Sequence, residues 1–365
     1  MRLRSLRLFQ FRNVANAAIQ CDYPRVFFEG LNGQGKTNLL EAVSFLHSLR
    51  SFRISDRSIL IQKEKETASI QAAWEHDVQG ETSVSVVLEK RARRVAVDGE
   101  PIKRLSSYIG QFPSVTMASQ DIQLIRGGPA ERRRFLDMVL AGSSIEYLNT
   151  FQRFQKTLLE RNQLLKRGRS DAELAAFDKI WVPVSVKLTQ ERARAIQQLG
   201  SVMQDTYGEL ADGKEVPGLK YVPSVSTDNE AEWAEMVEQS KERDRFLGAT
   251  QKGPHRDELR LLLDGQLASS HGSEGQQRGL VLALRFAELR WVCEQTGLLP
   301  VLLADDILTE LDASRRERFW RLSDQWEGLQ ILATGTEFPK SEKANEWVRY
   351  SVDQGTYTNA DPSSK

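Results

Sequence analysis

Eight residues starting at Gly30 read Gly-Leu-Asn-Gly-Gln-Gly-Lys-Thr, a spacing of glycines, lysine and hydroxyl that is typical of a phosphate-binding loop. We expect Gly30, Gly33 and Gly35 to take positive φ angles and to turn backbone N–H groups toward an anion at a helix N-terminus. Lys36 can place a positive charge at the β- and γ-phosphates, and the Thr37 hydroxyl can ligate Mg²⁺. The segment therefore predicts a nucleoside triphosphate site.

The sequence on both sides of this loop supports that prediction. Tyr23–Phe28 is apolar, as expected of a buried strand, and Asn38–Arg50 carries apolar residues at helical spacing. A strand before the loop and a helix after it form the context that the pattern requires. The alternative is an ordinary glycine-rich turn, which this context disfavours.

A second group of candidate residues follows another apolar strand, Val301–Ala304, which ends in two carboxylates. Asp305 is the candidate for the metal bound with the phosphates. Asp306 is then placed to orient or deprotonate the attacking water, a role that requires a carboxylate within hydrogen-bond reach. The alternative is a pair of aspartates that cap a helix after a core strand.

A third group is the segment Ser273–Arg278, at the start of a strongly apolar helix predicted over Gln276–Val292. A serine hydroxyl, a glycine backbone and a helix N-terminus together make a second anion receptor. Because the chain then has two phosphate-binding ends for one nucleotide, we expect a site shared between two copies. Alternatively, Ser273 only caps the helix, which is common.

Composition limits the classes of function. Among the 365 residues, Lys plus Arg and Asp plus Glu each number 50, so a nucleic-acid site must be a local patch. Cys21 and Cys293 form no ligand-like spacing with the histidines, so neither a disulfide framework nor a zinc site is indicated. The N-terminus lacks the apolar region of a secretory signal, and no apolar run reaches the ~20 residues of a membrane span. A cytoplasmic protein is predicted.

The order of predicted elements indicates two lobes. We expect two strands within residues 1–30, an antiparallel sheet from three segments between Thr67 and Val97, and a polar, frayed tail after about Gly355. Long helical patterns begin near Ser119, and a helix is predicted over Ala172–Leu199 with a kink at Pro183. Residues 1–118 and 247–365 are predicted to form one lobe, and residues 119–246 a helical lobe.

Several further motifs complete a resemblance to one family. The phosphate loop, the segment 273–278 and the acidic segment 305–312 occur in the order of the Walker A, signature, and Walker B with D-loop motifs of an ABC-type ATPase. The other motifs are Ser51-Phe52-Arg53, Asp121 with Gly127-Gly128-Pro129, Arg132 to Asp137, and Gly253 to Glu258. Together they resemble the RecF family over nearly the whole chain. The fold class that this implies is α/β, an ABC-type P-loop ATPase head with an antiparallel β subdomain and an inserted α-helical lobe.

The resemblance also implies a function. It implies a weak ATPase that uses ATP and Mg²⁺, dimerises on ATP and binds gapped DNA at single-strand/double-strand junctions. With RecR and RecO it would help to load RecA in recombinational repair and replication-fork maintenance. The alternative is an ABC-type ATPase of another system, such as a transporter subunit or a condensin-like clamp. A nuclease would need a further cluster of acids, which the sequence does not indicate.

The resemblance assigns roles to individual residues. The expected nucleotide-binding residues are Arg12, Asn13, Gly30, Leu31, Asn32, Gly33, Gln34, Gly35, Lys36, Thr37 and Asn38. The expected catalytic residues are Lys36, Asp305 and Asp306, and the expected metal-site residues are Thr37, Asp305 and Gln120. The residues expected to face the γ-phosphate of a second copy are Ser273, Gly275 and Gln276. The chain departs from the family pattern at Gln120, where a glutamate is common, and at Glu274, where a neutral glutamine is usual.

Two arginine clusters are candidates for contacts with the DNA backbone, because clustered cations carry this kind of affinity. The first cluster is Arg132, Arg133 and Arg134. The second is Arg91, Arg93 and Arg94. The alternatives are solvated faces or, for the first cluster, cations that brace the two lobes.

Overall fold

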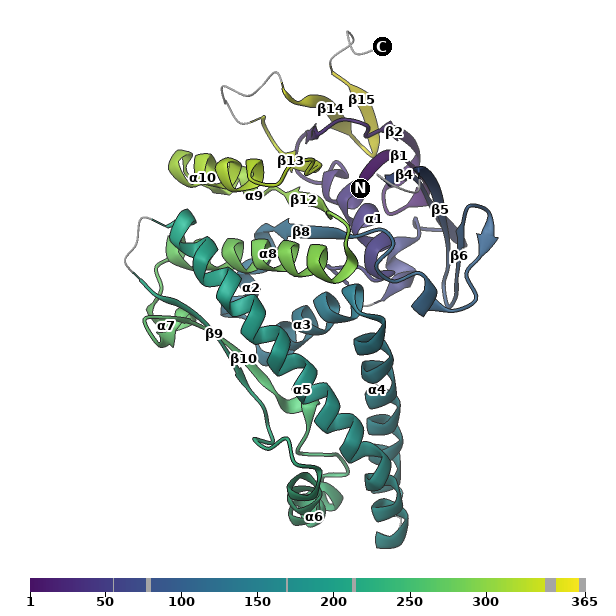
Figure 1. Ribbon diagram of the computed structural model, residues 1–365. Helices are drawn as coiled ribbons and strands as arrows, with labels where there is room; N and C mark the ends of the chain where they lie inside the picture. Colours follow the sequence, from purple (N-terminus) through teal and green to yellow (C-terminus); the bar gives the residue numbers. More distant parts are fainter. Residues whose placement is uncertain (55, 77–79, 169, 212–214, 339–345, 361–365) are drawn as a thin grey trace. The chain divides into compact units, whose positions relative to one another are not determined.

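The computed structural model describes residues 1–54, 56–76, 80–168, 170–211, 215–338 and 346–360. The chain forms two compact units (Figure 1). Unit 1 comprises Met1–Asp121, Glu209–Ala211 and Glu288–Lys365, and unit 2 comprises Ile122–Gly208 and Asp212–Ala287. The lobe boundaries expected from the sequence, and the assignment of the lobes as ATPase head and helical lobe, stay predictions.

Unit 1 is built on two six-stranded sheets. Its strands are β1 (Arg2–Phe11), β2 (Val14–Gln20), β3 (Arg25–Glu29), β4 (Thr67–His76), β5 (Gly80–Glu89), β6 (Arg93–Val97), β7 (Glu100–Pro101), β8 (Ser114–Ala118), β12 (Val301–Asp305), β13 (Ile331–Gly335), β14 (Val348–Asp353) and β15 (Thr356–Asn359). Its helices are α1 (Lys36–Ser48), η1 (Arg57–Leu60), η2 (Leu105–Ser107), η3 (Ser119–Ile122, whose last residue belongs to unit 2), α9 (Ile307–Glu310) and α10 (Ala313–Asp324).

The two sheets differ in strand direction and in sequence pattern. One has the order β2-β1-β4-β5-β6-β7 and is antiparallel, and its longer strands alternate buried and exposed residues. The other has the order β15-β14-β3-β13-β12-β8 and is parallel except for β15. Its β8, β12 and β13 are buried at every residue, as expected where both faces of a parallel sheet are covered.

One hydrophobic core joins the two sheets of unit 1. It includes Leu3 and Ile70 from the antiparallel sheet, Val26 from β3 and Leu39 from α1, all fully buried. Because α1 is buried around its circumference and packs against β8, β12 and β13 of the parallel sheet and β1 of the other, its first turn is held firmly at the carboxyl ends of the parallel strands. This arrangement is what positions the predicted phosphate loop.

Unit 2 combines helices with a small antiparallel sheet of order β11-β10-β9. Its elements are α2 (Gln123–Arg126), α3 (Pro129–Ser143), α4 (Ile145–Lys166), α5 (Asp171–Leu210), β9 (Pro217–Val222), α6 (Glu230–Leu247), η4 (Pro254–Arg256), β10 (Glu258–Leu263), β11 (Gln266–Leu267), α7 (Ala268–His271) and α8 (Glu274–Thr296), with α5 and α8 running on into unit 1. Two fully buried arginines hold its elements together: Arg161 is paired with Asp178 and Asp244, and Arg192 with Asp137 and Asp257.

Three of the expected elements are wrong in extent. Residues 1–30 contain three strands rather than two, because β2 pairs with β1 although its sequence is rich in alanine. The helix expected to end at Leu199 continues to Leu210, with Pro183 inside it. The tail is ordered at least to Asn359: Gln354 and Gly355 both have positive φ, 46° and 79°, and turn the chain back so that β15 pairs with β14.

Candidate nucleotide site and signature segment

The phosphate loop lies between β3 and α1. Gly33 and Gly35 have φ angles of 82° and 113°, so glycine is required at both by backbone conformation. The expectation of a positive φ at Gly30 is wrong. Glycine is needed there because a Cβ atom would lie only 2.3 Å from the carbonyl oxygen of Val352 in β14. Two glycines thus shape the loop, and the third lets a neighbouring strand approach it.

The C-terminal hairpin holds this loop from the side. The N–H of Gly355, in the turn between β14 and β15, donates to the Gln34 carbonyl over 2.7 Å, and the N–H of Gln354 donates to Gln34 Oε1 over 2.8 Å. The Tyr357 hydroxyl donates to the Gly35 carbonyl over 2.9 Å. This support was not predicted from the sequence. The Gln354-Gly355 turn signal between two β-forming stretches could have indicated it.

Lys36 lies at the first position of α1 with its side chain folded over the loop. Its Nζ donates to the carbonyl oxygens of Gly30 and Leu31, over 2.8 and 3.1 Å, and the residue is only 4% exposed. Gly35, the cap residue of α1, provides no side chain to satisfy the first N–H groups of the helix. Among the described residues no side chain caps this first turn, so the loop presents a held cation at an uncapped helix N-terminus, which is the arrangement an anion requires.

Thr37 and Asp305 meet where α1 and β12 come together. Asp305 Oδ1 accepts hydrogen bonds from the hydroxyls of Thr37 and Thr334, over 2.8 and 2.9 Å. Burial raises the pKa of the Asp305 carboxyl, the hydrogen bonds from the two threonines oppose this, and the neighbouring Asp306 adds to it. Hydroxyl and carboxylate oxygens are the donors that Mg²⁺ prefers, so these residues fit that ion.

Asp306 follows β12 and has an unusual backbone. Its φ is 55°, and its N–H donates to the Thr334 hydroxyl over 3.0 Å. Its Oδ1 is buried and has no hydrogen-bond partner among the described residues. A non-glycine residue in this conformation, carrying an unpaired buried acceptor, is characteristic of a functional position. Such an acceptor fits a water molecule or a metal-bound water.

Gln120 reaches the same edge of the parallel sheet through β8. Ala118 at the end of β8 is the pairing partner of Asp305, and the Ser119 hydroxyl lies 3.5 Å from the Asp305 carbonyl. Gln120 is the next residue, in η3, and its side chain is exposed. Parallel pairing of β8 with β12 thus brings Gln120 to the edge where Asp305 and Asp306 lie.

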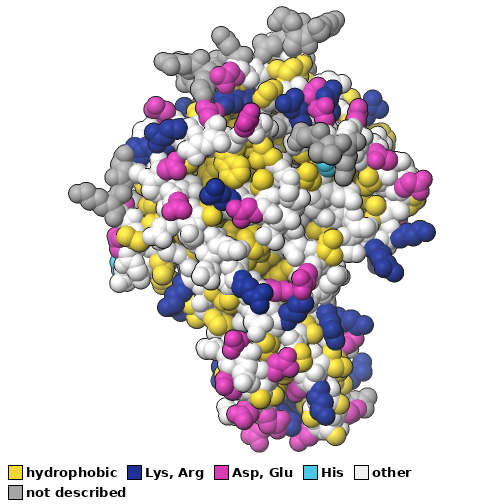
Figure 2. All heavy atoms as spheres, viewed as in Figure 1, with side chains coloured by type: hydrophobic (Ala, Val, Ile, Leu, Met, Phe, Trp, Pro, Cys, Tyr) yellow, Lys and Arg dark blue, Asp and Glu magenta, His cyan; other side chains and the backbone are white. Residues whose placement is uncertain are grey.

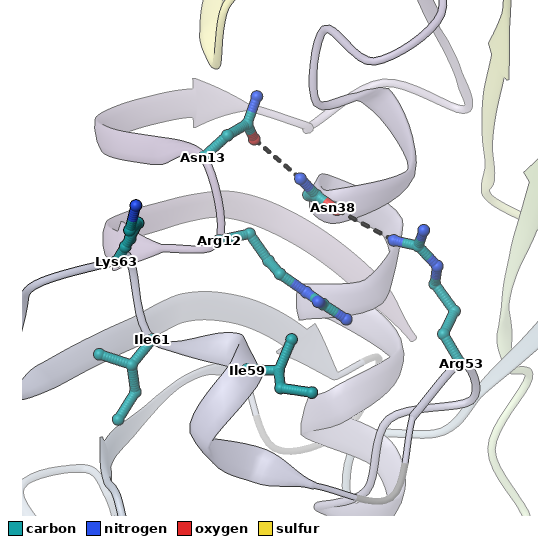
Figure 3. Close-up of a pocket in the computed structure, with 7 residues that line it drawn as sticks. All are labelled: Arg12, Asn13, Asn38, Arg53, Ile59, Ile61 and Lys63. Carbon is teal, nitrogen blue, oxygen red and sulfur yellow. Dashed lines mark hydrogen bonds between the residues drawn. The ribbon is translucent and has the colours of Figure 1, made fainter.

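A pocket of roughly 440 Å³ opens beside the phosphate loop, and Figure 3 shows the residues that line it: Arg12, Asn13, Asn38, Arg53, Ile59, Ile61 and Lys63. Asn38 Nδ2 donates to Asn13 Oδ1 over 2.8 Å, and Arg53 donates to Asn38 Oδ1 over 3.1 Å. Arg12 makes a two-point contact with Glu41, at 2.8 and 2.7 Å. The pocket combines cations with an exposed apolar side, which suits a phosphorylated nucleoside.

The pocket adds residues to the predicted nucleotide set. Ile59, Ile61 and Lys63 were not predicted, because no local pattern marks them: they come from η1, from the β-bridge residue after it and from the turn that follows. Arg53 was noted only as part of a family motif. Arg12 and Asn13 were predicted, and they reach the pocket from the turn between β1 and β2.

The signature segment lies in unit 2 at the N-terminus of α8. Gln276 accepts the Ser273 N–H on Oε1 over 2.7 Å, and the Ser273 hydroxyl accepts the Gln276 N–H over 3.3 Å. This reciprocal pair is a capping box. The buried Gln277 fixes the loop before it, donating to the carbonyls of Ala268 and Gly272 and accepting from Arg126. Gly275 lies in the first turn of α8.

Arg132 and Arg133 of the first arginine cluster form hydrogen bonds with other parts of unit 2. Arg132 makes a two-point contact with Glu258, at 2.8 and 2.9 Å, and also donates to the carbonyls of Leu124 and Gly127. Arg133 donates to the Asp257 carbonyl over 2.8 Å. Arg134, the third residue of this cluster, is only partly exposed. Arg132 and Arg133 brace α3 against β10 and its flank.

The second cluster lies on β6 and the turn before it, and Figure 2 shows Lys and Arg side chains at the right-hand edge, where Figure 1 has β6. Arg91 and Arg94 are exposed, and Arg94 pairs with Glu89. Arg93 donates to the Leu49 carbonyl, and burial together with Arg57 and Arg50 lowers its pKa to about 10. In the described part of the chain, no carboxylate forms an ion pair with Arg50, Arg57 or Arg93.

Comparison with known proteins places the chain in a family. Residues 2–358 match the profile of the RecF/RecN/SMC N terminal domain. The chain is 34% identical over 367 residues to the DNA replication and repair protein RecF of Halalkalibacterium halodurans, a match that covers 98% of this chain and 99% of the relative. The chain belongs to the RecF family.

Solved structures agree with this family assignment. The recombination mediator protein RecF-ATP in the RecFOR pathway superposes with a TM-score of 0.90 and 26% identity, covering 99% of this chain and 98% of that one. The Smc head bound to the C-winged helix domain of ScpA superposes over 98% of this chain and 96% of that one, with a TM-score of 0.56 and 13% identity, and so shares the fold. These matches confirm the predicted fold class. In the described residues, no helix has the length and apolar character that crossing a membrane requires.

Proposed function

We propose that this chain is an ATP-dependent DNA-binding protein of recombinational repair and replication-fork maintenance. The observation that carries the proposal is the convergence of Thr37, Asp305 and Asp306 at one end of the parallel sheet, beside the phosphate loop at the N-terminus of α1. The RecF-ATP structure supports ATP as the ligand, because the likeness covers nearly the whole chain. A cytoplasmic location goes with this function.

ATP binding is proposed to exchange one set of contacts for another. Lys36 would release the carbonyl oxygens of Gly30 and Leu31 and donate to the β- and γ-phosphates, which are stronger acceptors because they are charged. The nucleotide set is completed by Arg12, Asn13, Asn32, Gly33, Gln34, Gly35, Thr37 and Asn38. The base and ribose would lie in the pocket lined by Ile59 and Ile61.

Hydrolysis is proposed to be slow. Thr37, Asp305 and Gln120 would hold Mg²⁺, which when bound neutralises charge on the phosphates. Asp306, with its unpaired buried oxygen, would accept a hydrogen bond from the attacking water and orient it. A second copy would supply Ser273, Gly275 and Gln276 to the γ-phosphate, so that ATP joins a homodimer.

Contacts with gapped DNA are proposed for the second arginine cluster. Arg91 and Arg94 are exposed, and Arg50, Arg57 and Arg93 form an adjacent group of cations. A phosphate backbone would relieve the mutual repulsion of these cations. Arg132 and Arg133 are better explained as structural, since both already have partners. RecR is the proposed direct partner, with RecO and the loading of RecA following from it.

The test is fluorescence anisotropy of a labelled gapped duplex, titrated with protein in the presence and absence of ATP·Mg²⁺. The proposal expects ATP to tighten binding and Ser273→Arg to remove the gain. Ser201→Arg is the matched control, because it adds the same charge at an exposed position of α5. Binding that does not respond to ATP in the unmodified chain would overturn the proposal.

A further inference from the structure

The side-chain amide of Gln276 is held at both its oxygen and its nitrogen by contacts within its own chain. Its Oε1 accepts the Ser273 N–H, and its Nε2 donates to Oε1 of Glu215, a residue 61 positions earlier that precedes β9. The Ser273 hydroxyl in turn accepts the Gln276 N–H. Three donors at this helix terminus are therefore already used: the Ser273 N–H, the backbone N–H of Gln276 and one N–H of its side-chain amide.

The contact with Glu215 differs in kind from the capping box. A capping box is neutral and is a normal way to end a helix. A carboxylate that accepts an amide N–H makes a charge-assisted hydrogen bond, which is stronger than a neutral one. The other oxygen of Glu215 is buried and finds no hydrogen-bond partner among the described residues. Within the described part of the chain, the Glu215 side chain thus hydrogen-bonds to Gln276 alone.

We propose that Glu215 is a latch that holds Gln276 away from the shared nucleotide site. The inference rests on the proposed function, in which Gln276 of one copy faces the γ-phosphate bound to another. The γ-phosphate and the Glu215 carboxylate are both anions that accept from the same amide nitrogen, whose position is fixed by the contacts with Ser273 and Glu215. A γ-phosphate at this amide therefore approaches the Glu215 carboxylate, and the repulsion between the two negative charges opposes closure of the dimer until Gln276 turns away from Glu215.

Glu274, the acidic residue two positions before Gln276, does not make the direct contact with Gln276 that Glu215 makes. Glu274, inside the signature, is 62% exposed at its side chain and forms an ion pair with Arg278 over 3.0 Å. It makes no hydrogen bond to Gln276 in the described part of the chain. Glu274 can act only through its field, whereas Glu215 acts through a direct bond. The two residues can therefore be separated by substitution.

The test is sedimentation velocity of the full chain with Mg²⁺ and a non-hydrolysable ATP analogue. The substitution Glu215→Gln removes the charge but keeps an acceptor, and Glu215→Ala removes both. We expect both variants to tighten nucleotide-dependent dimerisation by about fivefold, because a charge-assisted bond no longer opposes closure. Affinity of the monomer for a fluorescent ATP analogue should not change. Glu235→Gln on α6 and Glu274→Gln are the controls, expected to shift dimerisation by less than about twofold.

A second measurement separates the latch from a general effect of charge. If Glu215 acts through Gln276, then Glu215→Gln should tighten dimerisation much less in a Gln276→Ala background than in the unmodified chain. Equal tightening by Glu274→Gln, or unchanged dimerisation in both Glu215 variants while the unmodified chain dimerises, would overturn the latch. Failure of the unmodified chain to dimerise with nucleotide would instead overturn the shared site.

Discussion

Two helices of this protein begin at predicted phosphate-binding ends, and they differ in whether side chains cap the first turn. The first turn of α1 follows Gly35, which offers no side-chain cap among the described residues. The first turn of α8 is closed by Ser273 and Gln276 in a capping box, and Glu215 accepts a hydrogen bond from the side-chain nitrogen of Gln276. In the described part of the chain, side chains therefore cap the first turn of α8 but not that of α1.

This difference indicates that the terminus of α8 is the more stable without a ligand and that the terminus of α1 is the more ready to bind one. An uncapped helix terminus is unfavourable by itself, so α1 depends on the core beneath it and on the C-terminal hairpin beside it. It is consequently ready for a ligand at any time. The terminus of α8 is stable without a ligand and must be opened before it binds one. We therefore expect substitutions at α1 to change ATP affinity directly, and substitutions at α8 to change dimerisation.

The largest effect is expected for Lys36→Met. Methionine keeps the apolar stem but loses the charge that would move from the carbonyls of Gly30 and Leu31 to the phosphates. We expect ATP affinity to fall about 100-fold, since charge-assisted hydrogen bonds are among the strongest in proteins. Titration with a fluorescent ATP analogue measures this, with Lys65→Met at an exposed position as the control. An affinity within threefold of the unmodified chain would contradict the prediction.

Gly30→Ala should destabilise the protein more than Gly33→Ala. A methyl group at Gly30 would collide with the backbone carbonyl of Val352, which cannot move aside as a flexible side chain can. We expect a loss of about 2 kcal/mol in the free energy of unfolding of unit 1. At Gly33 the added atom has open space but a φ of 82°, which costs about 1 kcal/mol. Urea unfolding of the two variants tests the order, and equal losses would show that β14 does not constrain the loop.

Asp305→Asn is expected to have opposite effects with and without nucleotide. Without nucleotide, asparagine removes a buried carboxylate while its Oδ1 can still accept from Thr37 and Thr334. We expect a gain of about 1 kcal/mol in stability. With ATP·Mg²⁺, the unmodified chain should gain stability by ligand binding and the variant should not. Thermal unfolding under both conditions measures this, and a variant stabilised by ATP·Mg²⁺ as strongly as the unmodified chain would remove Asp305 from the metal site.

The parts of the site that consist of contiguous residues could be predicted from the sequence. The phosphate loop and the buried strand before Asp305 are local patterns with a local physical cause, so their types and order could be recognised. The support of the loop could not be predicted, because it comes from β14 and β15, more than 300 residues away. The need for glycine at Gly30 arises from that same distant strand, which explains why the expected cause was wrong.

Charged side chains were the least predictable part of the candidate site. Arg132 and Arg133 resembled a nucleic-acid patch in the sequence, but Glu258 and the Asp257 carbonyl, more than 120 residues later, engage them. Glu215 carries no pattern at all and is recognised only because the fold places it beside Gln276. Pairing between distant residues depends on tertiary structure, and a single sequence does not report it.

Ser273→Ala is expected to have the smallest effect and to sharpen the comparison between the two helices. Alanine removes the hydroxyl that accepts the Gln276 N–H, and loss of an N-cap costs about 1 kcal/mol. Hydrogen exchange should therefore be about fivefold faster at the first-turn amides of α8 and unchanged at those of α1. Ser201→Ala, at an exposed position inside α5, is the control. If exchange at α8 does not change, the Glu215–Gln276 contact alone holds the terminus, and the latch is stronger than the cap that it accompanies.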